Sequence, residues 1–94
     1  MQAFGEQISA VCRTIELLLL AKNEVYGNSA LDPIRIFSRA DPVEQLRVRI
    51  DDKLSRLARG GHDLAAVGES HIDTIKDLIG YLILLLVALE RDRL

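Results

Sequence analysis

The sequence predicts an all-α protein, a three-helix protomer that forms an oligomeric helical bundle. Two observations predict the helices: apolar residues recur at steps of three and four in two stretches and fill a third, and two stretches open with a capping signature. A third observation predicts the oligomer. Of the 94 residues, 49% are hydrophobic and only 4% are aromatic. A domain this small buries so much aliphatic surface poorly on its own.

The chain is expected to be a single domain, residues 1–94, because it has no room for a second core. Its net charge is −2, which argues against a DNA-binding partner. The single cysteine, Cys12, excludes an intramolecular disulfide, and we expect it to pack on an apolar helix. Residues 1–20 lack signal-peptide features, and the longest apolar run, residues 78–89, is too short to span a membrane. We therefore expect a cytoplasmic protein without a membrane partner.

The first predicted helix runs from Phe4 to Lys22 and can reach Val25. Its apolar stripe has a coiled-coil-like period. Lys22 occupies the next position of that stripe. Its stem can lie along apolar surface with the ammonium in water, or the cation can point into a pocket between helices. The stripe consists of Phe4, Ile8, Val11, Ile15 and Leu18.

An irregular segment, Asn23 to Ala40, follows this helix. Gly27 and Asn28 tolerate left-handed backbone conformations, so the chain is predicted to turn sharply there. Tyr26 lies beside the turn and could stack on a ring, or it could simply cover the hydrophobic core.

The second predicted helix has the clearest start in the chain. Asp41 can cap it, Pro42 suits its first position, and Glu44 falls at the third. The helix is expected to run to Arg59 and to stop at Gly60-Gly61. Its core face is predicted to consist of Val43, Leu46, Ile50, Leu54 and Leu57.

A polar stripe lies beside that core face. It consists of Gln45, Arg49, Asp52 and Arg56, with Lys53 at its border. Asp52 can pair with both arginines on a solvated face, worth a few tenths of a kcal/mol per pair. Alternatively, the stripe is a cationic shelf that binds phosphate, with Asp52 orienting the guanidinium groups.

The third predicted helix runs from His71 to Leu89. Ser70 and Asp73 have the spacing of a capping box. Asp73, Asp77 and Tyr81 follow at steps of four, so the two carboxylates could share a divalent metal or offset the arginines of the second helix. Beyond Tyr81 the helix is apolar on all sides, which indicates burial against several partners, including another copy of the chain.

Three short motifs occur in order within residues 15–89. Together they resemble the nucleotide-modification-associated domain family of phages and their hosts, which is similar to MazG-like all-α NTP pyrophosphohydrolases. The resemblance implies an all-α fold, assembly as a dimer or larger, and nucleotide handling. The motifs are Lys22-Asn23-x-x-Tyr26-Gly27-Asn28-Ser29, Arg49-Ile50-Asp51-Asp52-Lys53-Leu54-Ser55-Arg56-Leu57, and Asp73-Thr74-x-x-Asp77-Leu78-x-Gly80-Tyr81.

The sequence differs from the hydrolase pattern in its acidic residues. MazG-like enzymes carry E-x-x-E on one helix and E-x-x-D on a later one, and these acids hold magnesium. Here basic residues stand among the expected acids of the second helix, and only Asp73 and Asp77 remain on the third, with Glu69 before them. Such a set makes a poor Mg²⁺ cage but a plausible polar pocket for a nucleotide.

Our first hypothesis is therefore a nucleotide-binding protein without robust catalysis or a cofactor. In a phage setting it would be an anti-defence sponge that sequesters a nucleotide second messenger, linear or cyclic, at a subunit interface. The cations would meet phosphate, Tyr26 would stack, and the carboxylates would accept hydrogen bonds. The candidate ligand-binding residues are Lys22, Tyr26, Asn28, Arg49, Asp52, Lys53, Arg56, Asp73, Asp77 and Tyr81.

Two alternatives remain open. In a Mg²⁺-dependent pyrophosphohydrolase, Asp52, Asp73 and Asp77 would hold the metal, and the basic residues would clamp the triphosphate. In a non-catalytic structural or adaptor bundle, the same charges would be solvated surface.

Overall fold

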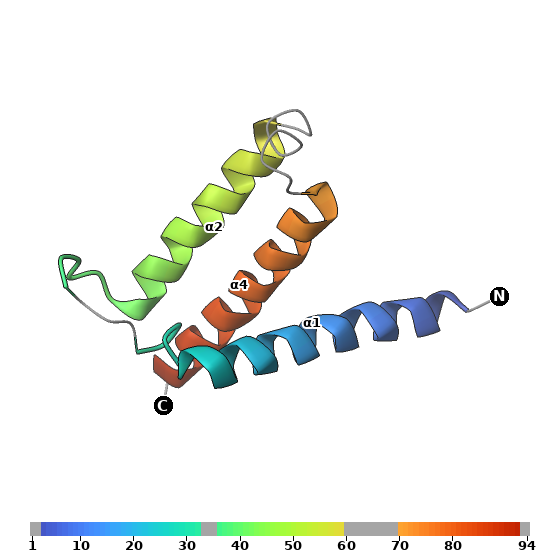
Figure 1. The fold of residues 1–94 in the computed structure, drawn as a ribbon, viewed down its shortest axis with the longest axis horizontal. Helices are drawn as coiled ribbons and strands as arrows, with labels where there is room; N and C mark the ends of the chain where they lie inside the picture. Colours follow the sequence, from blue (N-terminus) through green and yellow to red (C-terminus); the bar gives the residue numbers. More distant parts are fainter. Residues whose placement is uncertain (1–2, 33–35, 60–69, 93–94) are drawn as a thin grey trace.

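The computed structural model describes residues 3–32, 36–59 and 70–92 of the chain. It contains three helices, named as in Figure 1: α1 (Phe4–Tyr26), α2 (Pro42–Arg59) and α4 (His71–Asp92). No strand occurs in these ranges. The predicted all-α class and the three predicted helices are confirmed. The second and third helices begin at the predicted residues, and α4 continues past its predicted end at Leu89 to Asp92.

Side-chain caps set the starts of α2 and α4, as the sequence predicts. The Glu44 backbone N–H donates to Asp41 Oδ1 at 2.8 Å, and the Asp73 N–H donates to Ser70 Oγ at 3.0 Å. These bonds satisfy N–H groups that have no partner within the helix. By contrast, α1 begins after Ala3, which provides no side-chain cap.

The predicted turn after α1 is also present. Gly27 and Asn28 have φ values of 59° and 63°, in the left-handed region where a side chain is unfavourable and glycine is not. The Gly27 N–H donates to the Asn23 carbonyl at 2.9 Å and closes the helix. The stop predicted at Gly60-Gly61 lies outside the described residues.

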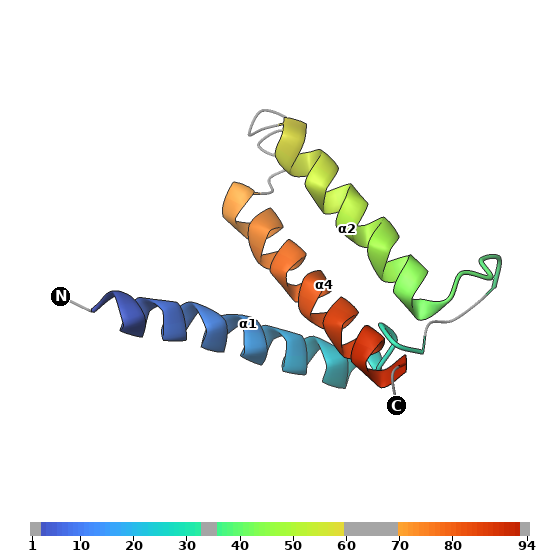
Figure 2. The ribbon, with the colours of Figure 1, turned by 180° about the vertical axis from the view of Figure 1, so that it is seen from behind.

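Helices α2 and α4 lie side by side and antiparallel, and their packing makes most of the core (Figure 1 and Figure 2). Leu46 and Ile50 of α2 and Ala88 of α4 are buried. Thr74 is fully buried as well, and its hydroxyl donates to the Ser70 carbonyl at 3.3 Å. This buried polar group is therefore satisfied within its own helix.

Helix α1 crosses α4 near its own C-terminal half, and its N-terminal half projects away from the other helices (Figure 1). Ile15 is its one buried residue. At the crossing, a Cβ atom added to Gly80 would come 3.1 Å from Leu19 Cδ2, so the glycine lets the two helices approach closely. The extents are 47 × 34 × 24 Å. The radius of gyration is 15.2 Å, against roughly 12 Å for a compact domain of this length.

Two sequence-based predictions of burial are wrong for the single chain. Cys12 is exposed. Leu54, placed on the predicted core face of α2, is 49% exposed. Much of α4 beyond Tyr81 is open in the single chain, and the predicted burial of this part against another copy stays a prediction. The apolar stripe of α1, for which the sequence predicted a period but no partner, is largely exposed at Phe4, Ile8, Val11 and Leu18.

No helix within residues 3–32, 36–59 and 70–92 is both long and apolar enough to cross a membrane.

Candidate functional site

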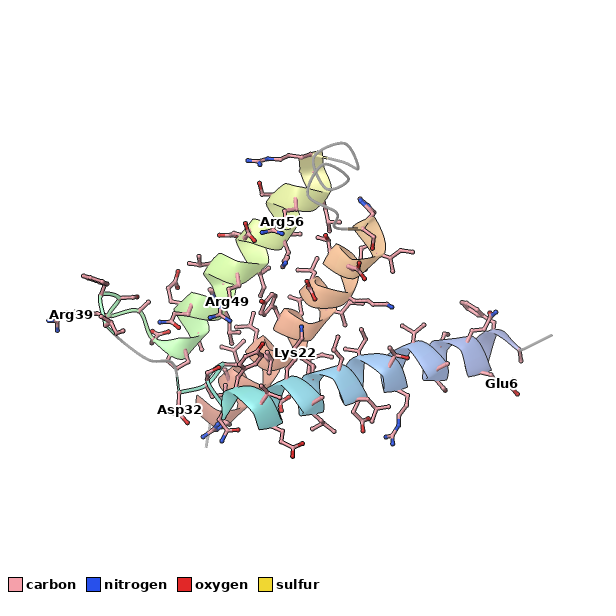
Figure 3. All side chains as sticks on the ribbon, in the orientation of Figure 1. Glu6, Lys22, Asp32, Arg39, Arg49 and Arg56 are labelled. Atoms are coloured by element: carbon pink, nitrogen blue, oxygen red, sulfur yellow. The ribbon has the colours of Figure 1, made fainter. Side chains whose placement is uncertain are left out.

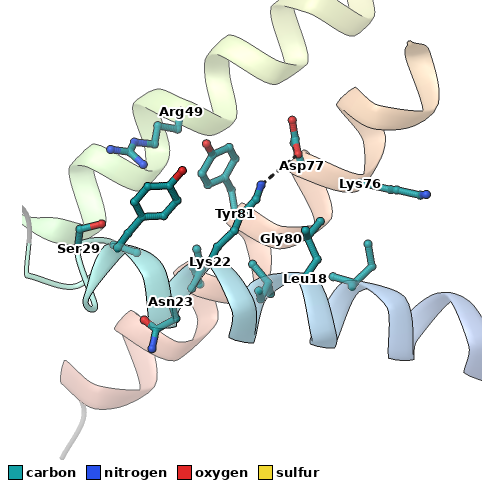
Figure 4. A pocket seen from close by; sticks show the side chains of 14 residues that line it. Leu18, Lys22, Asn23, Ser29, Arg49, Lys76, Asp77, Gly80 and Tyr81 are labelled. Carbon is teal, nitrogen blue, oxygen red and sulfur yellow. Dashed lines mark ion pairs between the residues drawn. The ribbon is translucent and has the colours of Figure 1, made fainter. Parts of the chain in front are cut away.

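A cavity of about 290 Å³ opens where α1, the turn after it, α2 and α4 meet (Figure 4). We call it the three-helix pocket. Its size lies near the lower end of small-molecule sites, roughly 300–1,000 Å³. It is lined by Ile15, Leu18, Leu19, Lys22, Asn23, Tyr26, Ser29, Ala30, Arg49, Lys76, Asp77, Gly80, Tyr81 and Leu84.

The apolar part of the lining comes from the helix crossing that builds the pocket. Ile15, Leu18 and Leu19 are on α1, and Leu84 is on α4. Gly80 holds this crossing close. An apolar wall with a few convergent polar groups is the usual composition of a binding site for an organic ligand.

The charged part of the lining is mainly positive. Lys22, Arg49 and Lys76 contribute three cations, and Asp77 contributes one carboxylate, for a formal charge of +2. Lys22 and Arg49 approach the same region from α1 and α2, whereas Arg56 lies farther along α2 (Figure 3). A protein of net charge −2 thus has a local site that favours anions.

Asp77 joins all three helices through ion pairs. Its Oδ2 lies 3.2 Å from Lys53 Nζ of α2, and its Oδ1 lies 3.8 Å from Lys22 Nζ of α1. The side chains of Lys53 and Asp77 are only 12% and 29% exposed, whereas that of Lys22 is 52% exposed. The pair with Lys53 is therefore the shorter and more buried one. Lys22 is exposed enough to leave the Asp77 carboxylate and pair with an anion of a ligand.

Two tyrosines border the pocket. The guanidinium carbon of Arg49 lies 5.9 Å from the centre of the Tyr81 ring, within the range of a cation–π contact. This contact places the Arg49 side chain at the pocket edge (Figure 4). Tyr26 remains largely exposed beside the left-handed turn, so one of its faces is open to a flat ligand.

The structure brings together about half of the predicted ligand-binding residues. Five of them line the pocket and Lys53 contacts it through Asp77, whereas Asn28, Asp52, Arg56 and Asp73 do not line it. Asp52 pairs with Arg56 at 3.2 Å on the surface of α2. The Asn28 carbonyl accepts the N–H groups of Leu31 and Asp32 and shapes the turn. The five that line the pocket are Lys22, Tyr26, Arg49, Asp77 and Tyr81.

Sequence reasoning missed several lining residues. Asn23 and Ser29 lie inside the first motif, beside the residues that were selected. Lys76 directly precedes Asp77, and the apolar wall at Leu19 and Leu84 gives no polar signal at all. The first motif could have identified Asn23 and Ser29. The apolar lining residues Leu19 and Leu84 could not be identified in this way, because their place in the pocket depends on where α1 crosses α4.

The acids of the hydrolase alternative are not gathered into a metal site. Within residues 3–32, 36–59 and 70–92, no three His, Cys, Asp or Glu side chains form a group that could hold a metal ion. Asp52 is engaged by Arg56, and Asp73 lies in the first turn of α4. Glu69, which we considered as a further acid, lies outside the described residues.

A second cavity, of about 410 Å³, lies between the start of α2 and the end of α4. Among the described residues that line it, only Asp41 and Arg91 are charged, and the Asp41 carboxylate already caps α2. The remaining lining is apolar, at Leu31, Pro42, Val43, Ala88 and Leu89. The described lining of the second cavity includes neither an aromatic ring nor a group of cations, so the three-helix pocket is the stronger candidate.

Comparisons with protein-family models, with curated proteins and with solved structures find no match to this chain. The resemblance to the nucleotide-modification-associated domain family therefore stays a prediction, and the argument for function depends on the pocket itself.

Proposed function

We propose that this protein binds a nucleotide in the three-helix pocket and sequesters it without turning it over. The observation that carries the proposal is the presence of Arg49 and Lys22 in one apolar-walled cavity with two tyrosines. A nucleotide combines a flat base with an anionic phosphate. The tyrosines suit the base and the cations suit the phosphate.

The two ends of the ligand would have different partners. Arg49 presents a planar guanidinium, which can donate two hydrogen bonds to one phosphate. Lys22 can leave its long 3.8 Å contact with Asp77 for a phosphate oxygen. Tyr26 offers an exposed ring for stacking, and Asp77 accepts hydrogen bonds from base N–H or sugar hydroxyl groups.

Binding is favoured over hydrolysis because the described acids do not converge. Among the described residues that line the pocket, Asp77 has the one carboxylate, and two lysines already pair with it. The proposal therefore assigns Asp77 to organising the pocket. A Mg²⁺-dependent pyrophosphohydrolase would need further acids around it.

Isothermal titration against linear mono-, di- and triphosphates and cyclic mono- and dinucleotides tests the proposal. Arg49→Ala should lower the affinity for the bound nucleotide at least about tenfold, because a charge-assisted contact is lost. Arg47→Ala is the matched control, since Arg47 is on the same helix and pairs with Glu44 outside the pocket. If no member of the panel binds, or if the control weakens binding equally, the proposal is wrong.

The stacking role has its own pair of variants. Tyr26→Phe keeps the ring and should retain the affinity, whereas Tyr26→Ala should weaken it by about 1–3 kcal/mol, the value of one base–aromatic contact. If both substitutions weaken the affinity equally, the Tyr26 hydroxyl group, and not its ring, makes the contact with the ligand.

The same samples separate sequestration from hydrolysis. Chromatography of the bound nucleotide after incubation with Mg²⁺ should recover it intact. Pyrophosphate release that disappears in Asp77→Asn would support the hydrolase instead.

A structural or adaptor bundle is the second candidate, favoured by the exposed apolar residues of α1 and α4. It predicts that Arg49→Ala and Lys53→Ala alter no ligand affinity and change stability only slightly. In that case the titration panel would give no binding at all.

A further inference from the structure

The contacts that hold α1 on α4 are made by residues that also line the three-helix pocket. Ile15 is the buried residue of α1, and Leu19 meets Gly80 of α4 at their close approach. Lys22 reaches Asp77 of α4 at 3.8 Å (Figure 4). All five residues line the pocket. The pocket therefore exists only while α1 rests on α4, and we call this state docked α1.

Docked α1 has little further support from the other helices. Within the described residues, α1 packs on α4 much less than α2 does, and its packing against α2 is smaller still. Its N-terminal half projects away, and Phe4, Ile8 and Val11 are exposed there (Figure 1). A helix without packing is only marginally stable in water. We therefore expect α1 to open as a separate unit, at a lower cost in free energy than the α2–α4 pair.

A nucleotide in the pocket would add a contact between α1 and α2. Among the described lining residues, Arg49 is the one from α2, and it approaches the same region as Lys22 of α1 (Figure 3). A phosphate bound by both cations would connect the two helices. It would replace the long contact of Lys22 with Asp77. Tyr26, the last residue of α1, would add its ring to the base.

We propose that a bound nucleotide holds α1 in its docked position, so that occupancy of the pocket controls how much of α1 is exposed. This inference rests on the proposed function and adds a regulatory step to it. Opening of α1 removes six of the fourteen described lining residues, so the open chain does not bind and the nucleotide shifts the population to the docked chain. Open α1 exposes Ile15 and Leu19 and extends the apolar stripe that begins at Phe4, whereas the nucleotide keeps this extension covered.

Hydrogen exchange of the full chain, without and with nucleotide, tests the linkage. In the free chain, the amides of residues 15–26 should exchange at least about 100-fold faster than the most protected amides of α2, at residues 46–54. The probes are the linear and cyclic nucleotides of the titration panel, each at about 100 times its dissociation constant. Every opening that destroys the site then becomes about 100-fold rarer. The amides of residues 15–26 should therefore slow about 100-fold, as those of α2 do.

Two outcomes would overturn this inference and leave the proposed function intact. In the first, the nucleotide slows the amides of α2 but not those of residues 15–26, which would mean that α1 opens with the nucleotide in place. In the second, residues 15–26 are already as protected as α2 in the free chain. If no nucleotide of the panel binds, the proposed function is wrong and the linkage is wrong with it.

The same substitution at two glycines tests whether the crossing controls the opening of α1. Gly80→Leu places a side chain against Leu19 and should speed the exchange of residues 15–26 in the free chain on the order of tenfold or more. Gly5→Leu is the matched control, because a Cβ atom added there meets nothing within 4 Å. It should leave this exchange within about threefold of the wild type. In both variants the amides of α2 should keep their protection.

Leu19→Ala removes the other partner of the same contact and provides the test if Gly80→Leu does not fold. It should also speed the exchange of residues 15–26 while α2 stays protected. Unchanged exchange of residues 15–26 in both variants would mean that the crossing does not hold α1, and the proposal would be wrong.

Arg49→Ala separates the opening of α1 from its control by the nucleotide. In the free chain this variant should exchange at residues 15–26 as the wild type does. At the same nucleotide concentration, the slowing of these amides should shrink by the factor by which the affinity falls in the titration. Full slowing despite the weaker binding would contradict the linkage.

Discussion

The α2–α4 pair and the α1–α4 crossing differ in how each is held. The first pair buries Leu46, Ile50, Thr74 and Ala88 along the length of two helices. The crossing buries Ile15 and Gly80, brings the two helices close at that glycine, and adds one long ion pair from Lys22. Helix α1 also lacks a side-chain cap, whereas the starts of α2 and α4 have one.

This difference indicates that the core of the fold and the candidate binding site depend on different helix contacts. The α2–α4 pair makes most of the contacts between helices and contains most of the buried side chains. The crossing is packed less completely, and the space it leaves is the three-helix pocket. Elements that are less stable and partly exposed are the ones that adjust to ligands. We therefore expect changes at the crossing to affect the pocket first and the fold second.

Removing buried side chains from each region should give the largest contrast. Leu46→Ala should lower the free energy of unfolding by about 2–5 kcal/mol, because Leu46 is only 1% exposed and its loss leaves a cavity. Ile15→Ala should act more locally, raising hydrogen exchange in α1 while α2 and α4 stay protected. Urea denaturation and hydrogen exchange measure the two effects. Equal loss of protection in all three helices of the Ile15 variant would contradict the separation.

The ion pairs of Asp77 should have an intermediate effect. Asp77→Asn should cost about 1–2 kcal/mol of folding free energy, because it leaves the largely buried Lys53 ammonium without its carboxylate. Asp52→Asn is the control, since it breaks the more exposed pair with Arg56 and should cost only a few tenths of a kcal/mol. Chemical denaturation of both variants tests the order, and a larger cost in the control would contradict it.

The helix caps should give the smallest effects. Ser70→Ala should cost about 1 kcal/mol by removing the bond to the Asp73 N–H. Ala3→Ser should instead add helix content to the first turn of α1, where no side chain now caps the helix. Circular dichroism and thermal unfolding measure both changes. An unchanged first turn in the Ala3 variant would mean that packing, and not capping, limits α1.

Much of the fold could be predicted because its signals are local. The Asp41 and Ser70 caps and the left-handed pair Gly27-Asn28 each depend on residues within one turn of each other, and all are confirmed. The site was predicted only in part. Tyr26, Arg49 and Asp77 line the pocket, but Arg56 and Asp73 do not. The spacing of residues in the sequence shows which side chains share a face of a helix, but it does not show which other helix packs against that face.

Burial was the least predictable property. The pattern of α2 predicted Leu54 as a core position, yet Leu54 is exposed in the single chain, as are Phe4 and Val11 of the apolar stripe of α1. Periodicity reports that a face is apolar, but it does not say which partner covers that face.

The sequence by itself determined the all-α class, the starts of α2 and α4 and the turn at Gly27, since each follows from backbone hydrogen bonding and conformational preference over a few residues. Only the tertiary structure decided that Lys22, Lys53 and Asp77 meet, that Gly80 admits Leu19, and that a cavity remains between them. Those outcomes depend on the angle and depth at which α1 crosses α4. That geometry is set by side-chain packing between residues far apart in the chain.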